Sequence, residues 1–489
     1  MECFVGLTLS KGTRLVEEVS GFLAIERPLQ PDWPRMTLTG MTPGLRAVIE
    51  QIQKKGVPAP ELMAQVLRTD GFIGLGRLNQ YLKKLDQYSL IERQLIVDGV
   101  ISASIRPLSA DFSYTENKID SNQRFALSRF AYLRKHRNGM ILECPLGHAE
   151  VACQSGHVMQ VVHALSTAVS AREISQNQTD LTQEAITILL NFLANAHALV
   201  AVSADSPEAS DPETHDAVLA PWEFHDLLFH TRCRLGRHDH PYGGTFPFKG
   251  KLAPLPVTKK EASDRAISLY KPEIEALKKH DRPFTDVLES RRSLRNYDDA
   301  PLTVNQLGEF LYRSARIQNV SEDGTVSFRP SPGGGALHEL EIYPVVDLCK
   351  GLEPGLYHYN PLNHELYKVA DQNPYVQLLV RVAQITAQAE KPPQVLLIIA
   401  ARFQRMQHKY QSVTYSVILK NVGALYQTMY LVGTAMGLAP CGLGGGHADL
   451  FTKAAGTDYL EETSVGEFIL GSRAATPFKL ARKADDHVL

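Results

Sequence analysis

Residues 395–436 read VLLIIAARFQRMQHKYQSVTYSVILKNVGALYQTMYLVGTAM. The first seven are all apolar, which is typical of a strand buried on both faces of a sheet. From Val413 onward, apolar residues recur every three or four positions, and this spacing predicts a long buried helix. A buried strand followed by a buried helix indicates a domain that mixes sheet and helix.

Lys409 and Tyr410 lie between these two elements, just before the predicted helix. The N-terminus of a helix carries a partial positive charge, which favours a neutral amine and a phenolate over their protonated forms. Either side chain could then exchange protons in catalysis. The ordinary alternative is a helix start at which the lysine reaches solvent and the tyrosine packs by its ring.

The residues around this stretch extend the same pattern. Apolar periodicity predicts helices at 304–316 and 374–388, and short apolar runs predict strands at 339–346 and 466–471. We therefore predict an α+β domain at residues 221–489.

An arginine cluster lies near the start of that domain, at residues 290–297, SRRSLRNY. Guanidinium groups bind phosphate through bidentate, charge-assisted hydrogen bonds, so the cluster could clamp a phosphate. A solvated basic helix end is the alternative, and the cluster alone does not decide between them.

Two glycine-rich stretches follow, RPSPGGGA at 329–336 and PCGLGGG at 440–446. Glycine lets the backbone approach a flat or anionic ligand closely, although the first stretch could also be a flexible turn. No strand is predicted directly before the second stretch, which argues against a dinucleotide-binding Rossmann motif. A loop lying along a cofactor ring remains open for both.

The N-terminal half shows one order of elements twice, short strands and then three helical patterns. We predict two winged-helix-like modules, at 1–108 and 109–203. An acidic stretch rich in Ser, Pro and Asp predicts a linker at 204–220.

The composition limits the classes of function that the protein can have. Of 489 residues, 44% are hydrophobic and 21% charged, as in ordinary globular proteins, and the net charge of -2 disfavours nucleic acid as a partner. Six scattered cysteines fit reduced thiols better than disulfides or a metal site, so we expect a cytoplasmic protein without a metal. No apolar run of about 18 residues is present, so no membrane partner is expected.

Taken together, these motifs resemble the azoline dehydrogenase branch of the flavin-dependent nitroreductase-like family, and within it the cyanobactin thiazoline oxidases. The likeness runs from about Pro221 to Arg473, through RRSLRNY, SPGGGALHELEIY, QHKYQS and LAPCGLGGG. The two N-terminal modules resemble the precursor-peptide-recognition domains of peptide-modifying enzymes. The fold expected is therefore α+β, with a nitroreductase-like FMN domain after two winged-helix-like modules.

The resemblance implies a homodimeric FMN enzyme that oxidises azoline rings of a ribosomally made precursor peptide, with Lys409 and Tyr410 as the catalytic pair. The residues implied to hold the phosphate and polar edge of FMN are Arg291, Arg292, Ser293 and Arg295. Those implied to approach the flavin from the partner chain are Ser331, Pro332, Gly333 and Gly334. Those implied to line the flavin ring are Gly442, Leu443, Gly444 and Gly445.

Three points stay open. Arg473 matches the phosphate-contacting end of nitroreductases only loosely. An NAD(P)H-dependent flavin reductase of nitro compounds or quinones is the rival enzyme. A winged-helix transcription regulator is the rival of another class, although residues 1–200 hold 20 basic and 19 acidic side chains and thus lack a basic excess.

Overall fold

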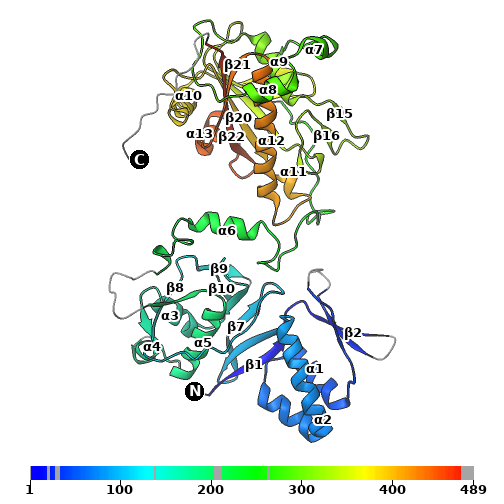
Figure 1. Ribbon diagram of the computed structural model, residues 1–489, viewed down its shortest axis with the longest axis vertical. Coiled ribbons are helices and arrows are strands. Elements are labelled where there is room, and N and C mark those ends of the chain that lie inside the picture. The colour runs from blue at the N-terminus through cyan, green and yellow to red at the C-terminus, as the bar shows by residue number, and fades with distance from the viewer. Residues whose placement is uncertain are drawn as a thin grey trace. The chain divides into compact units, whose positions relative to one another are not determined.

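The computed structural model describes residues 2–18, 22–27, 33–136, 139–177, 179–202, 212–261 and 265–474. The chain divides into two compact units, Met1–Pro241 and Tyr242–Leu489 (Figure 1). Both units mix helices and sheets, so the α+β prediction is confirmed.

The first unit contains an antiparallel sheet of seven strands. In sheet order the strands are β5 (Val57–Pro58), β1 (Cys3–Leu9), β6 (Ile91–Val97), β7 (Val100–Pro107), β11 (Ala149–Cys153), β10 (Gly139–Glu143) and β9 (Tyr132–His136). The pairing of β7 with β11 joins the first half of the unit to the second.

The order of elements in the first half recurs in the second. After β1 come β2 (Arg14–Glu17), β3 (Leu23–Glu26), β4 (Met36–Leu38), α1 (Pro43–Lys54), β5, α2 (Ala59–Gln87) and β6. After β8 (Arg124–Leu127) come β9, β10, β11, α3 (Gly156–Ala164), β12 (Val169–Ser170), α4 (Ala171–Asn177), α5 (Gln183–Asn195) and β13 (Leu199–Val202). Non-helical Gly71 interrupts α2, which therefore corresponds to α4 and α5 together. The strand order β5-β1-β6 at one end of the seven-stranded sheet likewise corresponds to the order β12-β8-β13 of a separate three-stranded sheet.

The helix α1 shows why these sequences fold locally as they do. Thr42 caps its N-terminus by accepting a hydrogen bond from the backbone N–H of Leu45. Leu45, Val48, Ile49 and Ile52 lie on one face and are fully buried. Burial of each such side chain stabilises the fold by about 1.5–3 kcal/mol, so the spacing read from the sequence is also the packed face.

The division between the units falls later than the predicted boundary at 220/221. Helix α6 (Phe224–Arg232) belongs to the first unit, where Leu227 is buried in the core and Trp222 packs against it. Glu213, within the predicted linker, accepts a hydrogen bond of 2.8 Å from the hydroxyl of Ser128. Residues 204–211 of that linker lie outside the described residues.

The second unit is built on another antiparallel sheet of seven strands. In sheet order they are β14 (Ala266–Ser268), β19 (Glu365–Asp371), β18 (Gly355–Asn360), β17 (Leu340–Val346), β20 (Val395–Arg402), β22 (Glu462–Ser472) and β21 (Leu438–Leu443). Helices α9 (Val304–Ala315) and α12 (Thr414–Ala435) pack on one face, and α10 (Pro374–Ala387) and α13 (Ala448–Ala455) on the other.

Strand β20 is buried on both faces, as predicted. Val395, Leu397 and Ile399 pack in the core shared with α9 and α12, whereas the alternate residues Leu396 and Ile398 pack in the core shared with α10 and α13. The prediction for the second glycine-rich stretch was incomplete, because Pro440 to Leu443 belong to strand β21 and not to a loop. Among the described helices, none is both long and apolar enough to cross a membrane.

Candidate functional site

The Lys–Tyr pair lies in a turn between two helices. Strand β20 leads into α11 (Phe403–Gln407), and α12 begins four residues after Tyr410. The backbone N–H groups of Lys409 and Tyr410 both donate to the carbonyl of Met406, at 3.1 and 2.9 Å. The hydroxyl of Thr414 donates to the carbonyl of Tyr410 at 2.8 Å. The backbone under the pair is therefore fixed at both ends.

The two side chains meet over the first glycine-rich loop. A Cβ atom built on Gly335 would lie 2.6 Å from Nζ of Lys409 and 2.7 Å from the hydroxyl of Tyr410. Gly335 also has a φ of 61°, in the left-handed region that favours glycine. Only glycine therefore lets both polar groups reach this point of the backbone.

Helix α12 holds this loop in place. The N–H of Gly334 donates to Oδ1 of Asn421 at 3.0 Å, and Nδ2 of Asn421 donates to the carboxylate of Glu339 at 2.9 Å. Burial raises the pKa of Glu339, which the hydrogen bond from Asn421 partly offsets. The ring of His338 lies under Gly333, and burial together with Arg329 and Arg405 lowers its pKa to about 4.

Arg405, four residues before Lys409, is a structural residue that the sequence reading missed. Its buried guanidinium donates to the carbonyls of Leu337, Leu255 and Thr325. Burial, together with Arg402 and Arg329, lowers its pKa to about 10, so it is still charged at neutral pH. Arg405 thereby ties the Lys–Tyr turn to the loop that carries Gly335.

The arginine cluster lies near the other end of α12. The hydroxyl of Ser293 is 2.8 Å from that of Tyr430, which also accepts a hydrogen bond of 2.8 Å from the N–H of Gly442. The guanidinium of Arg291 lies 5.2 Å from the centre of the Tyr430 ring. Arg473 joins the same region through a β-bridge to Tyr297. Tyr430 thus connects the arginine cluster to strand β21.

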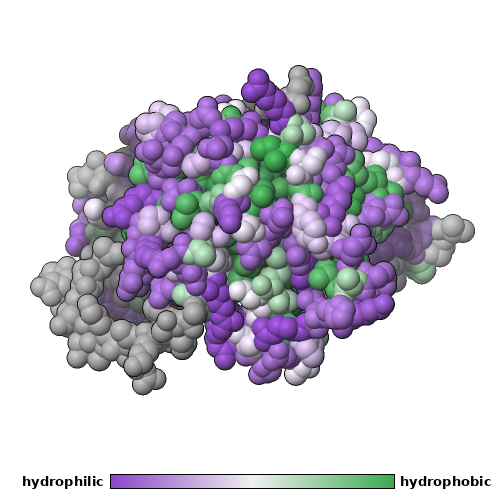
Figure 2. All heavy atoms as spheres, turned by 90° about the horizontal axis from the view of Figure 1, so that it is seen from above, coloured by the Kyte–Doolittle hydropathy of each residue, from purple (hydrophilic) through white to green (hydrophobic). Residues whose placement is uncertain are grey.

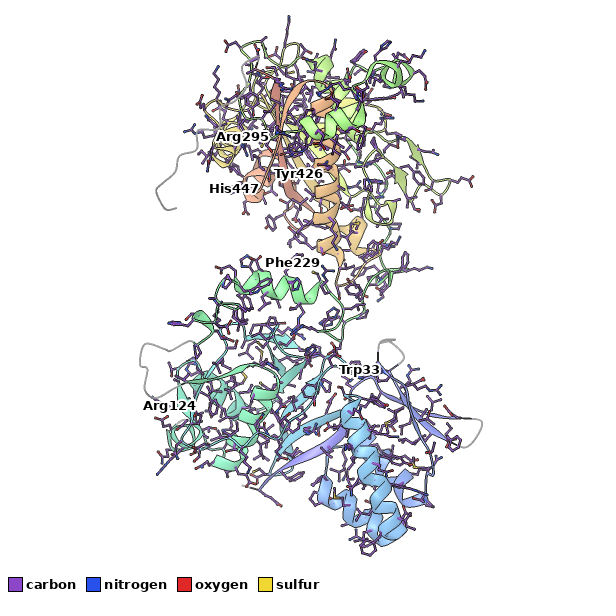
Figure 3. The ribbon with its side chains drawn as sticks, in the orientation of Figure 1. Trp33, Arg124, Phe229, Arg295, Tyr426 and His447 are labelled. Atoms are coloured by element: carbon purple, nitrogen blue, oxygen red, sulfur yellow. The ribbon has the colours of Figure 1, made fainter. Side chains whose placement is uncertain are left out.

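This cluster has the donors that an anion would need. Among the described residues, no carboxylate pairs with Arg291, Arg292 or Arg295. The Nε atom of Arg295 is buried and has no hydrogen-bond partner in the described part of the chain. Figure 3 labels Arg295 in the second unit, in the region of Tyr426 and His447. Buried donors of native proteins are normally satisfied, so an orphaned guanidinium N–H fits a site for a phosphate.

The second glycine-rich stretch divides into two parts. Gly442 lies in β21 with the ring of Tyr426 against it, where a Cβ would approach that ring to 3.0 Å. Leu443 ends the strand, and Gly444 and Gly445 are exposed with open space around them. A Cβ on Gly446 would collide with the carboxyl of Glu467, whose pKa is raised by burial. The sequence reading missed Glu467, because no local motif marks it.

The predicted site residues thus form two groups. The Lys–Tyr group contains Lys409, Tyr410 and the loop 331–335, and the arginine group contains residues 291–295, 442–445 and 473. Val417, against Gly334, and Tyr430, against Ser293, are 13 residues apart in α12. At 1.5 Å per residue this corresponds to about 20 Å along the helix axis. The structure therefore assembles each group but does not join them within one chain.

Comparison with known proteins shows which families the two units resemble. The family model of the cyanobactin oxidase ThcOx matches residues 125–239, and that of the nitroreductase family matches residues 288–472. MJ1384 of Methanocaldococcus jannaschii, named as a nitroreductase, is 32% identical over 173 residues, which cover 35% of this chain and 81% of that protein. The microcin B17-processing protein McbC of Escherichia coli is 31% identical over 119 residues, 22% of this chain and 42% of that protein.

One solved structure is similar as well. A chain of the E. coli microcin synthetase McbBCD complex, with truncated pro-MccB17 bound, is 22% identical with a TM-score of 0.33, and the match covers 56% of this chain and 98% of that one. The matches to the nitroreductase family model and to MJ1384 identify the second unit as an oxidoreductase domain of nitroreductase type. The chain belongs to the nitroreductase family.

The resemblance to cyanobactin oxidases inferred from the sequence is confirmed by the ThcOx match. The predicted fold class is confirmed in that helices and sheets are mixed and a nitroreductase-like domain follows an N-terminal region with the ThcOx match. The winged-helix-like character of the two modules stays a prediction. The roles assigned to individual residues remain predictions.

Proposed function

We propose that the protein oxidises thiazoline or oxazoline rings of a ribosomally made peptide to thiazoles or oxazoles, with FMN as cofactor and molecular oxygen as final electron acceptor. The observation that carries this proposal is the meeting of Nζ of Lys409 with the hydroxyl of Tyr410 over Gly335. The ThcOx match and the relation to McbC, a protein named for processing microcin B17, support a peptide substrate.

The chemistry explains why such a pair is useful. Aromatising an azoline removes one proton from a ring carbon and one hydride, that is, two electrons and two hydrogens in all. Bound FMN would supply the hydride acceptor. The Lys409–Tyr410 pair supplies the base that removes the proton and a donor that stabilises the negative charge developing on the ring. The turn fixes the backbone under both groups, and Arg405 ties that turn to the loop of Gly335.

The arginine group would hold the cofactor. Arg291, Arg292, Ser293 and Arg295 offer donors for its phosphate and polar edge, with Arg473 nearby in the same region. Gly442, Leu443, Gly444 and Gly445 offer a backbone surface for its ring. The orphaned Nε of Arg295 supports this assignment, because it lacks an acceptor that a phosphate would provide.

The separation of the two groups supports a homodimer. In a homodimer, each site could combine the arginine group of one subunit with the Lys–Tyr group of the other. The separation of about 20 Å along α12 would then not keep the two groups of one site apart. Exposed apolar side chains on α8 (Phe284–Ser290) and α12 offer a surface for a second copy, including Phe284, Leu288, Tyr415 and Leu419. Figure 2 shows hydrophobic residues in a band across an otherwise hydrophilic face at the end that carries α8.

The precursor peptide would bind to the first of the two modules by strand addition. In the second module, strand β11 lies at one end of the β9-β10-β11 group. Its free side is already paired with β7, so a peptide strand cannot add there. In the first module, the corresponding strand β4 pairs only with β3 among the described strands. A photocrosslinker at exposed Thr37 of β4 should capture the peptide, and one at exposed Leu133 of β9 should not. The reverse pattern would move the binding site to the second module.

The state of the cysteines bears on the compartment in which the protein works. All six are free thiols, which is typical of a reducing compartment, and we propose that the enzyme works in the cytoplasm.

The deciding experiment is incubation of the protein with a thiazoline-bearing peptide under air. Mass spectrometry should show the loss of two hydrogens per oxidised ring. The relation to MJ1384 favours an NAD(P)H-dependent reductase of nitro compounds or quinones as the second candidate. A yellow protein that leaves the peptide unchanged but reduces a quinone with NAD(P)H would establish that candidate instead.

A further inference from the structure

A segment at the start of the second unit lies along the Lys–Tyr turn. Residues 242–261, called the strap here, contain no regular helix or strand. Gly243 and Gln411 exchange two backbone hydrogen bonds, at 3.2 and 3.0 Å, and the N–H of Phe246 donates to the carbonyl of Lys409 at 3.0 Å. The hydroxyl of Thr245 donates to Oε1 of Gln411 at 2.6 Å. The first part of the strap is thus paired with the residues that carry the candidate catalytic pair.

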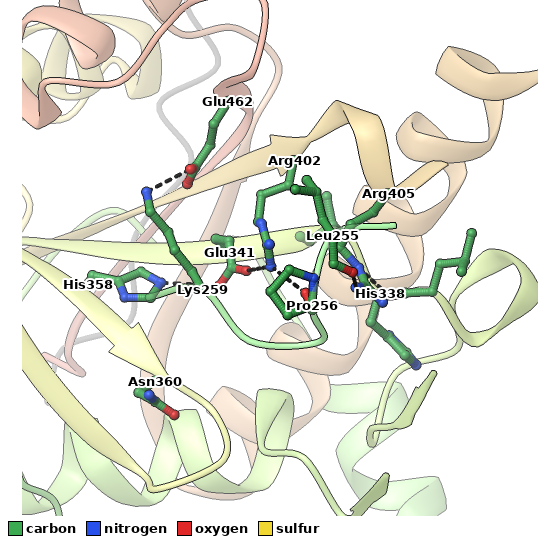
Figure 4. Close-up of polar contacts among 12 residues, drawn as sticks. Leu255, Pro256, Lys259, His338, Glu341, His358, Asn360, Arg402, Arg405 and Glu462 are labelled. Carbon is green, nitrogen blue, oxygen red and sulfur yellow. Dashed lines mark hydrogen bonds and ion pairs between the residues drawn. The ribbon is translucent and has the colours of Figure 1, made fainter. Parts of the chain in front are cut away.

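The rest of the strap is fixed at successive points, so it does not behave as a free connection. Gln404, Arg405 and Arg402 donate to its carbonyls at Ala253, Leu255 and Pro256. Lys259 forms an ion pair of 2.6 Å with Glu462 (Figure 4). These contacts hold the strap against α11 and against the ends of β20 and β22.

Phe246 is the residue of the strap that faces the site. The centre of its ring lies 5.9 Å from Nζ of Lys409, within the distance at which a ring face attracts an ammonium group. The side chain is 46% exposed, so part of the ring remains open. Its φ of 51° is uncommon for an aromatic residue, and such conformations concentrate at functional sites.

We infer that Phe246 is a positioning residue that keeps the amine of Lys409 directed at Gly335 and forms a wall of the substrate site. The alternative partner for the amine is the ring of Tyr410, at 5.3 Å, but that ring belongs to the pair itself. Of the two ring contacts that Lys409 makes within the described residues, the one with Phe246 comes from another segment of the chain. The role in catalysis rests on the proposed function, whereas the placement of the amine does not.

The test compares Phe246→Leu with Phe248→Leu in the full-length protein. Phe248 lies two residues further along the strap and is 38% exposed, so it is a matched control without a ring contact to Lys409. We expect Phe246→Leu to lower kcat about three- to thirtyfold with a smaller change in KM, which is the range of a lost cation–π contact. Phe246→Tyr should restore kcat, and all variants should keep bound flavin.

A second measurement does not depend on azoline oxidation. Acetylation of Lys409 by an amine-reactive reagent, followed by mass spectrometry, should be severalfold faster in Phe246→Leu than in wild type, with Lys249 and Lys251 as internal references. Unchanged labelling of Lys409 would overturn the inference, whatever reaction the enzyme catalyses. Faster labelling in a protein that leaves azolines intact would refute the proposed function and keep the placement of the amine.

Discussion

The two ends of α12 carry groups built in different ways. Near its N-terminus, the glycine-rich loop of the Lys–Tyr group is tied by hydrogen bonds within the chain, through Asn421, Glu339 and Arg405. Near its C-terminal end, Arg291, Arg292 and Arg295 have no carboxylate partner among the described residues, and the buried Nε of Arg295 has no hydrogen-bond partner there. The first group is held by contacts within the chain, whereas the second keeps guanidinium donors that no described carboxylate occupies. Changes at the two ends should therefore have separable effects.

The largest effect is expected at the chemical end. Lys409→Ala should lower azole formation by about 10²–10⁴-fold, the usual value of general base catalysis. FMN should stay bound, since the arginine group is intact, and the flavin absorbance of the purified protein checks this. Tyr410→Phe should also lose activity, though less. Near-normal turnover of Lys409→Ala would return the pair to the ordinary helix-start interpretation.

At the C-terminal end of α12, Arg295→Ala should weaken FMN binding and leave the positions of Lys409 and Tyr410 unchanged. A hydrogen bond to a charged group contributes about 1.5–3 kcal/mol, so FMN affinity should fall roughly 10- to 150-fold. Fluorescence titration of the apoprotein with FMN measures this. An unchanged affinity would show that the orphaned Nε does not mark the phosphate site.

Mixing these two variants tests whether the groups act across subunits. Random exchange of subunits should recover about one quarter of wild-type activity, because half of the dimers carry one intact composite site of two. Lys409→Ala mixed with Tyr410→Phe is the control, and it should recover no more than the Tyr410→Phe subunits contribute alone. No recovery in the first mixture would place both groups of a site in one chain.

A smaller effect is expected from the backbone under the pair. Gly335→Ala would push a methyl group into Lys409 and Tyr410, and we expect kcat to fall about 10- to 100-fold, in line with the cost of misplacing reacting groups. Gly437→Ala is the matched control, because its φ of 67° imposes the same backbone cost in open space. If both variants have equal kcat, the close approach at Gly335 has no catalytic role.

The smallest effect on activity should come from a buried network outside both groups. His358 lies between Glu261 and Glu341, at 2.8 and 3.1 Å, and Arg402 also contacts Glu341 (Figure 4). Burial opposes a charge on His358, but the hydrogen bonds and charges of both carboxylates raise its pKa to about 9. The same contacts outweigh burial at Glu341 and lower its pKa to about 2.

Because the pKa of His358 is raised on folding, its stabilisation is complete below pH 6.5 and is lost as the pH rises through 9. It amounts to at most about 3 kcal/mol. The free energy of unfolding of wild type, measured by calorimetry, should therefore fall more between pH 6.5 and 9.5 than that of His358→Gln. Turnover at pH 7 should be similar in both, and parallel pH profiles of unfolding would contradict the assignment.

The sequence predicted well those features that depend on local patterns. The all-apolar run predicted strand β20, and the apolar spacing after Val413 predicted helix α12, which begins at Thr414. Strand β21 was missed because Pro440, Cys441 and Gly442 do not form a strand pattern, and its pairing with β22 is a long-range contact. Periodicity cannot reveal such pairings.

The same limit applies to the candidate site. Lys409, Tyr410 and the arginines are visible as motifs, but Asn421, Glu467 and Phe246 gain their importance only from residues distant in sequence. No pattern in the sequence predicts that the strap, residues 242–261, pairs with the turn that holds Lys409.

The pairing of β7 with β11 has a thermodynamic consequence for the duplicated modules. A single sheet that crosses both copies couples them, so that unfolding one would expose the strand edge of the other. The first unit should therefore melt in one transition, in contrast to a pair of tandem domains that melt separately. The shared sheet thus lets each half of the first unit contribute to the stability of the other, independently of any ligand that either half binds.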